Sequence, residues 1–207
     1  MDITLYYTHR TRALRPRWVL EELGLPYRLR PVDLFGGESR TPEYRKIHPH
    51  GSVPALSVDG RIMIESCAIC HWLSDRFPEI QLAPPIADSV ARMAYEQWIF
   101  YVPGTLEPPA FQILLHSVIL PQAHRVPDIV PWSIRGYRSA LKLLNRELGN
   151  RDYIAGGTFT TADILLGSTL LWLPDMLKNH PALGDYTGRL QQRPAYQRAA
   201  TDPSPSA

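Results

Sequence analysis

The segment Gly51-Ser52-Val53-Pro54-Ala55-Leu56 constrains the fold more than any other part of this chain. Its Val-Pro step lies between two short apolar runs, which predicts a strand whose start is fixed by proline. Proline fixes its own φ, restricts the residue before it, and is the residue at which a cis peptide costs least. We therefore expect a short strand with a defined beginning at this point.

A second signal follows at Glu65-Ser66, where a short strand, 61–64, meets an apolar-periodic helix, 66–77. Serine is a good N-cap, and the first turn of a helix offers unpaired N–H groups with a partial positive charge. Such a corner can hold a small carboxylate. Taken alone, a Glu-Ser pair before a helix is usually only a cap.

The first 80 residues alternate between strand-like and helix-like patterns. Strands are expected at 3–7, 27–32, 54–58 and 61–64, and helices at 14–23, 42–47 and 66–77. This order is typical of a small thioredoxin-like layer of sheet and helices. The Pro-rich, nonperiodic segment 81–87 is expected to be a linker.

Everything after this linker is helical in pattern. Residues 90–101 and 130–148 carry apolar side chains close to the 3.6-residue period of a helix. Thr160 and Asp163 open an apolar run with the spacing of a capping box, in which the acid at N3 returns a hydrogen bond to the N-cap residue. We expect these two residues to be structural.

The composition, with 44% hydrophobic and 20% charged residues, is that of an ordinary soluble globular protein. The sequence opens on a strand-like segment without the pattern of a signal peptide. Its longest apolar stretch, 164–174, is shorter than the ~20 residues of a membrane span. We therefore expect a cytoplasmic location and no membrane partner.

The charge pattern gives no sign of a nucleic-acid partner, because the formal net charge is only +2 and no Lys/Arg run occurs. Arginine does cluster early, in a segment that also carries aromatic residues, at Arg10, Arg12, Arg15 and Arg17. An anion site and a solvated helix start both explain this cluster, and the sequence leaves both open.

The two cysteines of the chain, Cys67 and Cys70, are spaced C-x-x-C inside the predicted helix after Ser66. This spacing permits a redox motif. Positions i and i+3 share a helix face, however, so two small buried side chains are the better explanation. No second pair supplies the missing ligands of a zinc site, so we expect no metal.

The sequence resembles the cytosolic glutathione S-transferase superfamily over nearly its full length. The matching stretches are 20–27, 51–56, 65–66, 153–163 and 193–195. The resemblance implies an α/β thioredoxin-like domain at 1–80, a linker at 81–87 and an all-α helical domain at 88–207. It also implies a homodimeric detoxification enzyme, in which glutathione as cosubstrate is ionised to a thiolate that attacks a small hydrophobic electrophile.

The resemblance assigns two groups of residues to glutathione. Ser52, the Val53 backbone and a cis Pro54 would bind its cysteinyl unit in the manner of an added strand. Glu65 would accept a hydrogen bond from the ammonium group of the γ-glutamyl end, while the hydroxyl and amide of Ser66 would bind its carboxylate.

Thiolate formation requires a stabilising group, and family members use Tyr, Ser or Cys near the end of the first strand. In this chain the serine and cysteine positions fall on Arg10 and Arg12, and the tyrosine position falls on Tyr6. We predict Tyr6 as the hydrogen-bond donor to the thiolate, with Arg12 adding positive charge.

Two alternatives to this assignment stay open. Thr8 or Thr11 would replace Tyr6 as donor if the register slips. Tyr6 is otherwise a plain core residue, because strand alternation lets only one of Tyr6 and Tyr7 face the site.

The electrophile is expected to contact bulky side chains of the helical domain, namely Tyr101, Leu106 and Phe111. Other reactions remain open on the same scaffold, above all glutathione-dependent reduction of peroxides or disulfides. The serine-cysteine loop motif of the maleylacetoacetate isomerases is absent, which lowers that option. Arg10 and Arg12 at the usual catalytic positions favour a further alternative, a noncatalytic binding or regulatory protein.

Overall fold

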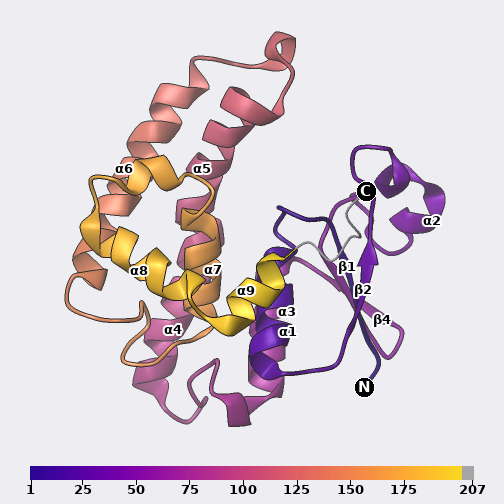
Figure 1. Cartoon of the computed structure of the whole chain (residues 1–207), viewed down its shortest axis with the longest axis horizontal. Helices are drawn as coiled ribbons and strands as arrows, with labels where there is room; N and C mark the ends of the chain where they lie inside the picture. Colours follow the sequence, from indigo (N-terminus) through magenta and orange to yellow (C-terminus); the bar gives the residue numbers. More distant parts are fainter. Residues whose placement is uncertain (202–207) are drawn as a thin grey trace. The chain divides into compact units, whose positions relative to one another are not determined.

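The computed structural model describes residues 1–201, and the last part of the predicted helical domain, 202–207, lies outside the described residues (Figure 1). By its contacts the chain divides into two compact units. Unit 1 comprises Met1–Leu82 and the segment from Gln192 onward, and unit 2 comprises Ala83–Gln191. The predicted domain limits stay a prediction, and this grouping differs from them at the C-terminus.

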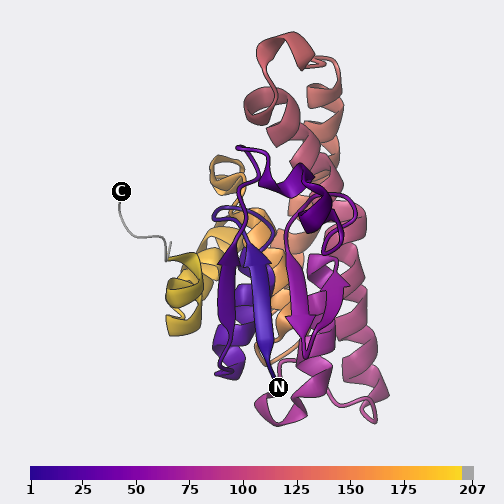
Figure 2. The same ribbon diagram turned by 90° about the vertical axis from the view of Figure 1, so that its right-hand side faces the viewer.

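Unit 1 contains a four-stranded mixed sheet in the order β2-β1-β3-β4, with its strands side by side in Figure 2. The strands are β1 (Ile3–Tyr7), β2 (Arg28–Pro31), β3 (Ala55–Val58) and β4 (Arg61–Ile64). β1 pairs in parallel with β2 and antiparallel with β3, and β3 pairs antiparallel with β4. The β3–β4 turn has φ of 49° at Asp59 and 80° at Gly60, as a tight hairpin turn with two left-handed residues requires.

The helices of unit 1 are α1 (Leu14–Leu23), α2 (Pro42–Arg45), α3 (Ser66–Arg76) and α9 (Pro194–Ala200), with short 3-10 turns at Glu38–Arg40 and Pro78–Ile80. α1 ends at Gly24, whose φ of 65° is the left-handed conformation that glycine adopts most readily. α1 packs against both α3 and α9. Trp18 of α1 is completely buried and lies edge-on to Tyr196 of α9, with ring centroids 4.8 Å apart.

Burial alternates along β1, as the two-residue period of a strand requires. Ile3, Leu5 and Tyr7 are buried on one face, while Thr4 and Tyr6 are half-buried on the other. The core of unit 1 is built on the first of these faces, from residues such as Leu5, Leu56 and Ile69, each of which is fully buried.

Unit 2 is all-helical, with α4 (Ser89–Tyr101), α5 (Glu107–Leu114), α6 (Ile129–Leu148), α7 (Thr161–Leu170) and α8 (Pro181–Gln191). Two wide π-helical turns, Val102–Leu106 and Leu115–Ile119, flank α5, and shorter 3-10 turns lie at Gln122–His124 and Pro174–Leu177. Pro103 lies in the first π-helical turn and has no N–H to donate, which explains the irregularity there. Every residue of α7 is buried, so α7 forms the centre of unit 2.

These elements confirm the predicted fold class, an α/β thioredoxin-like part followed by an all-α part. The capping box at Thr160 and Asp163 is confirmed as well. Within residues 1–201, no helix is both long and apolar enough to span a membrane.

Candidate functional site

The peptide bond before Pro54 is cis, as the resemblance implied. β3 begins at Ala55, so Val53 precedes the paired part of the strand. The Tyr44 hydroxyl donates a 2.7 Å hydrogen bond to the carbonyl of Ser52, which ties this loop to α2. Val53 is half-buried and Ser52 is exposed, so the loop presents a fixed segment of backbone at the surface.

Glu65 and Ser66 form the second part of the site, at the junction of β4 and α3. Glu65 has φ 72° and ψ 105°, a conformation that side-chain-bearing residues rarely adopt. Its side chain is exposed, whereas Ser66, the first residue of α3, is only 5% exposed. Backbone outliers of this kind concentrate at functional sites, where the surrounding structure enforces them.

Arg15 joins this junction from α1. Its side chain is 1% exposed, and its Nη1 donates to the Ser66 hydroxyl oxygen at 3.2 Å and to the Cys67 sulfur at 3.6 Å. Sequence reasoning missed this contact, although it noted the arginine cluster. The available signal was a charged residue at a position of α1 that the helix buries together with Trp18 and Val19.

His48 lies in the loop before Gly51 and is 5% exposed. Its Nδ1 is buried and has no hydrogen-bond partner among residues 1–201. Its ring lies 6.1 Å from that of His50. Burial lowers the pKa of His48, an effect that the charge of His50 reinforces and the Glu65 carboxylate opposes.

The predicted thiolate donor, Tyr6, lies on the face of the sheet that meets α2. Its ring is edge-on to that of Tyr44, with centroids 6.2 Å apart. Among residues 1–201 its hydroxyl has no hydrogen-bond partner. Tyr7 lies on the opposite face, where the Arg17 guanidinium is 5.8 Å from its ring centre. The role of Tyr6 stays a prediction.

The alternative donors are occupied within the β1–α1 turn. The Thr11 hydroxyl donates to the carbonyl of Thr8 at 2.7 Å, and the Thr8 hydroxyl donates to the carbonyl of Val32 at 2.7 Å. Because a hydroxyl has one proton, neither threonine can donate to a thiolate without losing its present bond, which for Thr8 runs to the residue after β2 and for Thr11 lies within the turn. Arg12, the predicted source of positive charge, is half-buried in the same turn.

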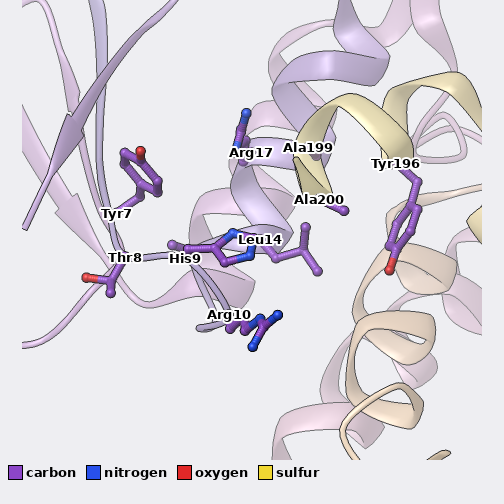
Figure 3. A pocket seen from close by; sticks show the side chains of 10 residues that line it. Tyr7, Thr8, His9, Arg10, Leu14, Arg17, Tyr196, Ala199 and Ala200 are labelled. Carbon is purple, nitrogen blue, oxygen red and sulfur yellow. The ribbon is translucent and has the colours of Figure 1, made fainter. Parts of the chain in front are cut away.

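A cavity of about 280 Å³ lies in unit 1 between this turn and α9 (Figure 3). Its lining consists of Tyr7, Thr8, His9, Arg10, Ala13, Leu14, Arg17, Tyr196, Ala199 and Ala200. Figure 3 shows Arg10 and Arg17 on opposite sides of Leu14. Arg17 donates to the carbonyl oxygens of Thr201 at 2.7 Å and Arg198 at 3.1 Å, so it holds the end of α9. Of the predicted donors, the cavity includes only the alternative Thr8.

The residues predicted to contact the electrophile belong to unit 2. Leu106 is completely buried there. Tyr101 and Phe111 are half-buried, and their rings lie 5.1 Å from Trp98 and 6.5 Å from Trp172. The proposed pocket stays a prediction.

Two known domain families match this chain. The family of glutathione S-transferase N-terminal domains matches residues 10–76, and the family of glutathione S-transferase C-terminal domains matches residues 112–194. Maleylacetoacetate isomerase of Pseudomonas aeruginosa is 29% identical over 80% of this chain and 78% of its own length. Disulfide-bond oxidoreductase YfcG of Escherichia coli is 28% identical over 95% of this chain and 94% of its own. The structure of a sphingomonad glutathione S-transferase complexed with glutathione covers 95% of this chain and 96% of its own, with 27% identity and a TM-score of 0.83.

Proposed function

Because the chain belongs to the cytosolic glutathione S-transferase superfamily, we propose that it binds glutathione, ionises its thiol and transfers the sulfur to a small electrophile. One observation carries this proposal. The cis Val53–Pro54 loop, the positive φ of Glu65 and the buried Ser66 at the start of α3 support it, because these are the features that recognition of a γ-glutamyl peptide would use.

Each part of this arrangement has a chemical task. The N–H groups at the start of α3 and the Ser66 hydroxyl bind the γ-glutamyl carboxylate, since a helix N-terminus favours negative charge. The exposed Glu65 carboxylate accepts hydrogen bonds from the neighbouring ammonium group. The backbone of Val53, just before the paired part of β3, holds the cysteinyl unit by main-chain hydrogen bonds.

The chemical step is nucleophilic attack by the glutathione sulfur. A free thiol has a pKa of ~8.5, and lowering it to about 6.5 requires roughly 2.7 kcal/mol of preferential stabilisation of the thiolate. We assign the hydrogen bond to Tyr6, whose hydroxyl has no partner among residues 1–201, and the nearby positive charge to Arg12. The thiolate then forms a carbon–sulfur bond with the electrophile and displaces its leaving group or adds to its double bond.

The test combines calorimetric titration with glutathione and ultraviolet detection of the bound thiolate between pH 6 and pH 8. We expect saturable binding and a thiolate signal that Tyr6→Phe reduces at least ~10-fold, the size of effect expected from losing one donor to a charged group. Tyr7→Phe is the matched control, because Tyr7 lies on the opposite face of the same strand. Absence of glutathione binding to the wild type would refute the proposal, and an unchanged signal in Tyr6→Phe would refute the assignment of the donor.

A second candidate is a glutathione-dependent disulfide reductase. Arg10 and Arg12 occupy the positions at which the family has serine or cysteine, and YfcG, named a disulfide-bond oxidoreductase, is similar along almost the whole chain. Binding of glutathione without a thiolate signal, together with turnover of a glutathione mixed disulfide, would favour this reaction. Binding with neither signal would favour a noncatalytic protein.

A further inference from the structure

The cavity between the β1–α1 turn and α9 is separate from the residues assigned to glutathione (Figure 3). Tyr7 lines it, whereas Tyr6, the predicted thiolate donor, lies on the opposite face of β1. Val53, Glu65 and Ser66 lie outside its described lining. We propose that this cavity is a second ligand site of unit 1, which binds a small aromatic carboxylate.

The charge of the lining favours an anion. The lining contains His9, Arg10 and Arg17, and within residues 1–201 it contains no carboxylate. Figure 3 shows the two arginines on opposite sides of Leu14, the first residue of α1, where the helix adds a partial positive charge. Within the same residues, His9 and Arg10 have neither an ion-pair nor a hydrogen-bond partner. Cations gathered at this end of a helix are unfavourable unless an anion balances them.

Arg17 supplies a second, independent observation. It is 7% exposed, and it donates to the carbonyl oxygens of Thr201 and Arg198. Its Nε is also buried but has no hydrogen-bond partner in the part of the chain that the structure describes. The neighbouring carboxylate of α1, Glu21, accepts from Arg198 and from the Tyr27 hydroxyl, both at 2.6 Å. Because buried donors are nearly always satisfied, this unpaired N–H indicates an acceptor from outside the chain, which a ligand carboxylate would supply.

The remainder of the lining selects the body of the ligand. Apart from the cations and Thr8, its residues are apolar or aromatic, namely Tyr7, Ala13, Leu14, Tyr196, Ala199 and Ala200. The volume of about 280 Å³ is close to the lower limit of ligand pockets, about 300 Å³, and suits a molecule of one or two rings. An inorganic anion would leave the apolar surface uncovered. An aromatic carboxylate covers this surface and also pairs its two oxygens with a guanidinium.

The experiment compares 2-naphthoate with its neutral isostere, 2-naphthamide, in calorimetric titrations. We expect one site per chain for 2-naphthoate and an affinity at least ~10-fold above that of the amide, because hydrogen bonds to a charged group are the stronger ones. Arg10→Gln should weaken the acid at least ~5-fold and the amide less than ~2-fold. Arg61→Gln is the matched control, because Arg61 is another exposed arginine of unit 1 and lies outside the lining.

Ala200→Phe tests where the acid binds, because it reduces the volume of the cavity without removing a charge. It should remove measurable binding of 2-naphthoate and leave the affinity for S-methylglutathione unchanged. Saturating S-methylglutathione should in turn change the affinity for 2-naphthoate less than ~2-fold, since independent sites show no coupling in either direction.

Four results would overturn the inference. They are no binding of 2-naphthoate to the wild type, equal affinity for acid and amide, full binding to Ala200→Phe, and displacement of 2-naphthoate by S-methylglutathione. Displacement would place the acid in the glutathione or electrophile site. Failure of S-methylglutathione to bind would refute the proposed function alone, because the two naphthalene ligands and the two variants test the cavity without it.

Discussion

Glu65 combines an exposed carboxylate with a backbone conformation that costs free energy in any residue except glycine. Its φ of 72° and ψ of 105° occur between a strand and a helix that are both well formed. Conformations of this kind cost of order 1–3 kcal/mol and persist where the neighbouring structure enforces them. The proposed function supplies a reason for retaining a glutamate there, namely recognition of an ammonium group.

Two substitutions separate strain from recognition at this residue. Glu65→Gly should have a free energy of unfolding about 1 kcal/mol above that of Glu65→Ala, because glycine adopts positive φ without the Cβ penalty. Both variants lack the carboxylate, so both should lose affinity for glutathione to the same extent. Urea denaturation and calorimetric titration measure the two effects, and a Glu65→Ala variant as stable as Glu65→Gly would disprove the strain.

At this scale the sequence indicates some site residues and hides others. Val53, Glu65 and Ser66 are recognisable because each lies beside a local signal, a proline or a helix start. Arg15 is not, since its partner Ser66 is 51 positions away and only the packing of α1 on α3 brings them together. The sequence also does not reveal that the Thr11 hydroxyl already donates its single proton to the carbonyl of Thr8.

At the scale of elements, the start of α7 shows how local and distant contacts combine. The Asp163 carboxylate accepts hydrogen bonds from the N–H groups of Ile154 and Thr160, both at 2.8 Å. It also accepts from the Thr160 hydroxyl at 3.2 Å and the Tyr186 hydroxyl at 2.8 Å. The capping box was predictable from spacing, whereas the bonds from Ile154 and Tyr186 depend on how unit 2 folds.

Asp163 also predicts how stability depends on pH. Burial raises its pKa from 3.8 to about 6, despite hydrogen bonds that act in the opposite direction. The folded state then binds more protons than the unfolded state between these values, so this group contributes most below pH 3.8 and its contribution is lost as pH rises through about 6. The full change is about 3 kcal/mol.

The measurement is the free energy of unfolding of wild type and Asp163→Asn from pH 4 to pH 7.5. Subtracting the free energy of unfolding of Asp163→Asn from that of the wild type cancels the contributions of titrating groups that both proteins contain. This difference should fall as pH rises towards 6 and stay constant above it. A rising difference would mean that the four donors outweigh burial and hold the pKa below its usual value. Thr187→Val is the control, because it removes a buried hydrogen bond, from the Thr187 hydroxyl to the carbonyl of Leu183, but no titratable group. Its difference from the wild type should not depend on pH.

The placement of α9 is the element-scale feature that the sequence could not indicate. Pro194 is suited to the first turn of a helix, but no local feature of the sequence indicates which element this helix packs against. Arg193 makes a two-armed ion pair with Glu22 of α1 at 2.6 and 2.9 Å, and Arg17 holds the carbonyls at the end of the helix. These contacts span most of the chain and group α9 with unit 1.

At the scale of the whole molecule, α4 carries an apolar stripe that unit 2 leaves uncovered. Val90, Met93 and Phe100 are 72%, 70% and 67% exposed, and their spacing places them on one face of the helix. Exposed apolar residues that lie together on one face are typical of interaction sites, whereas single exposed ones are ordinary. The resemblance implied a homodimer, and we propose that α4 forms its interface with a second copy of this chain.

Met93→Glu tests this proposal, because in a two-fold symmetric dimer it places two carboxylates, one from each chain, in the same interface. Sedimentation equilibrium should give the mass of two chains for the wild type. The dissociation constant of the Met93→Glu dimer should be at least ~10-fold higher, because the substitution buries an unpaired charge in the interface. Trp132→Glu is the control, since Trp132 of α6 is 71% exposed and lies outside the stripe. A wild-type mass of one chain would refute the proposal that α4 forms a homodimer interface. A shift of the same size in both variants would mean that the effect of Met93→Glu is not specific to the stripe, and would leave α4 unsupported as the interface.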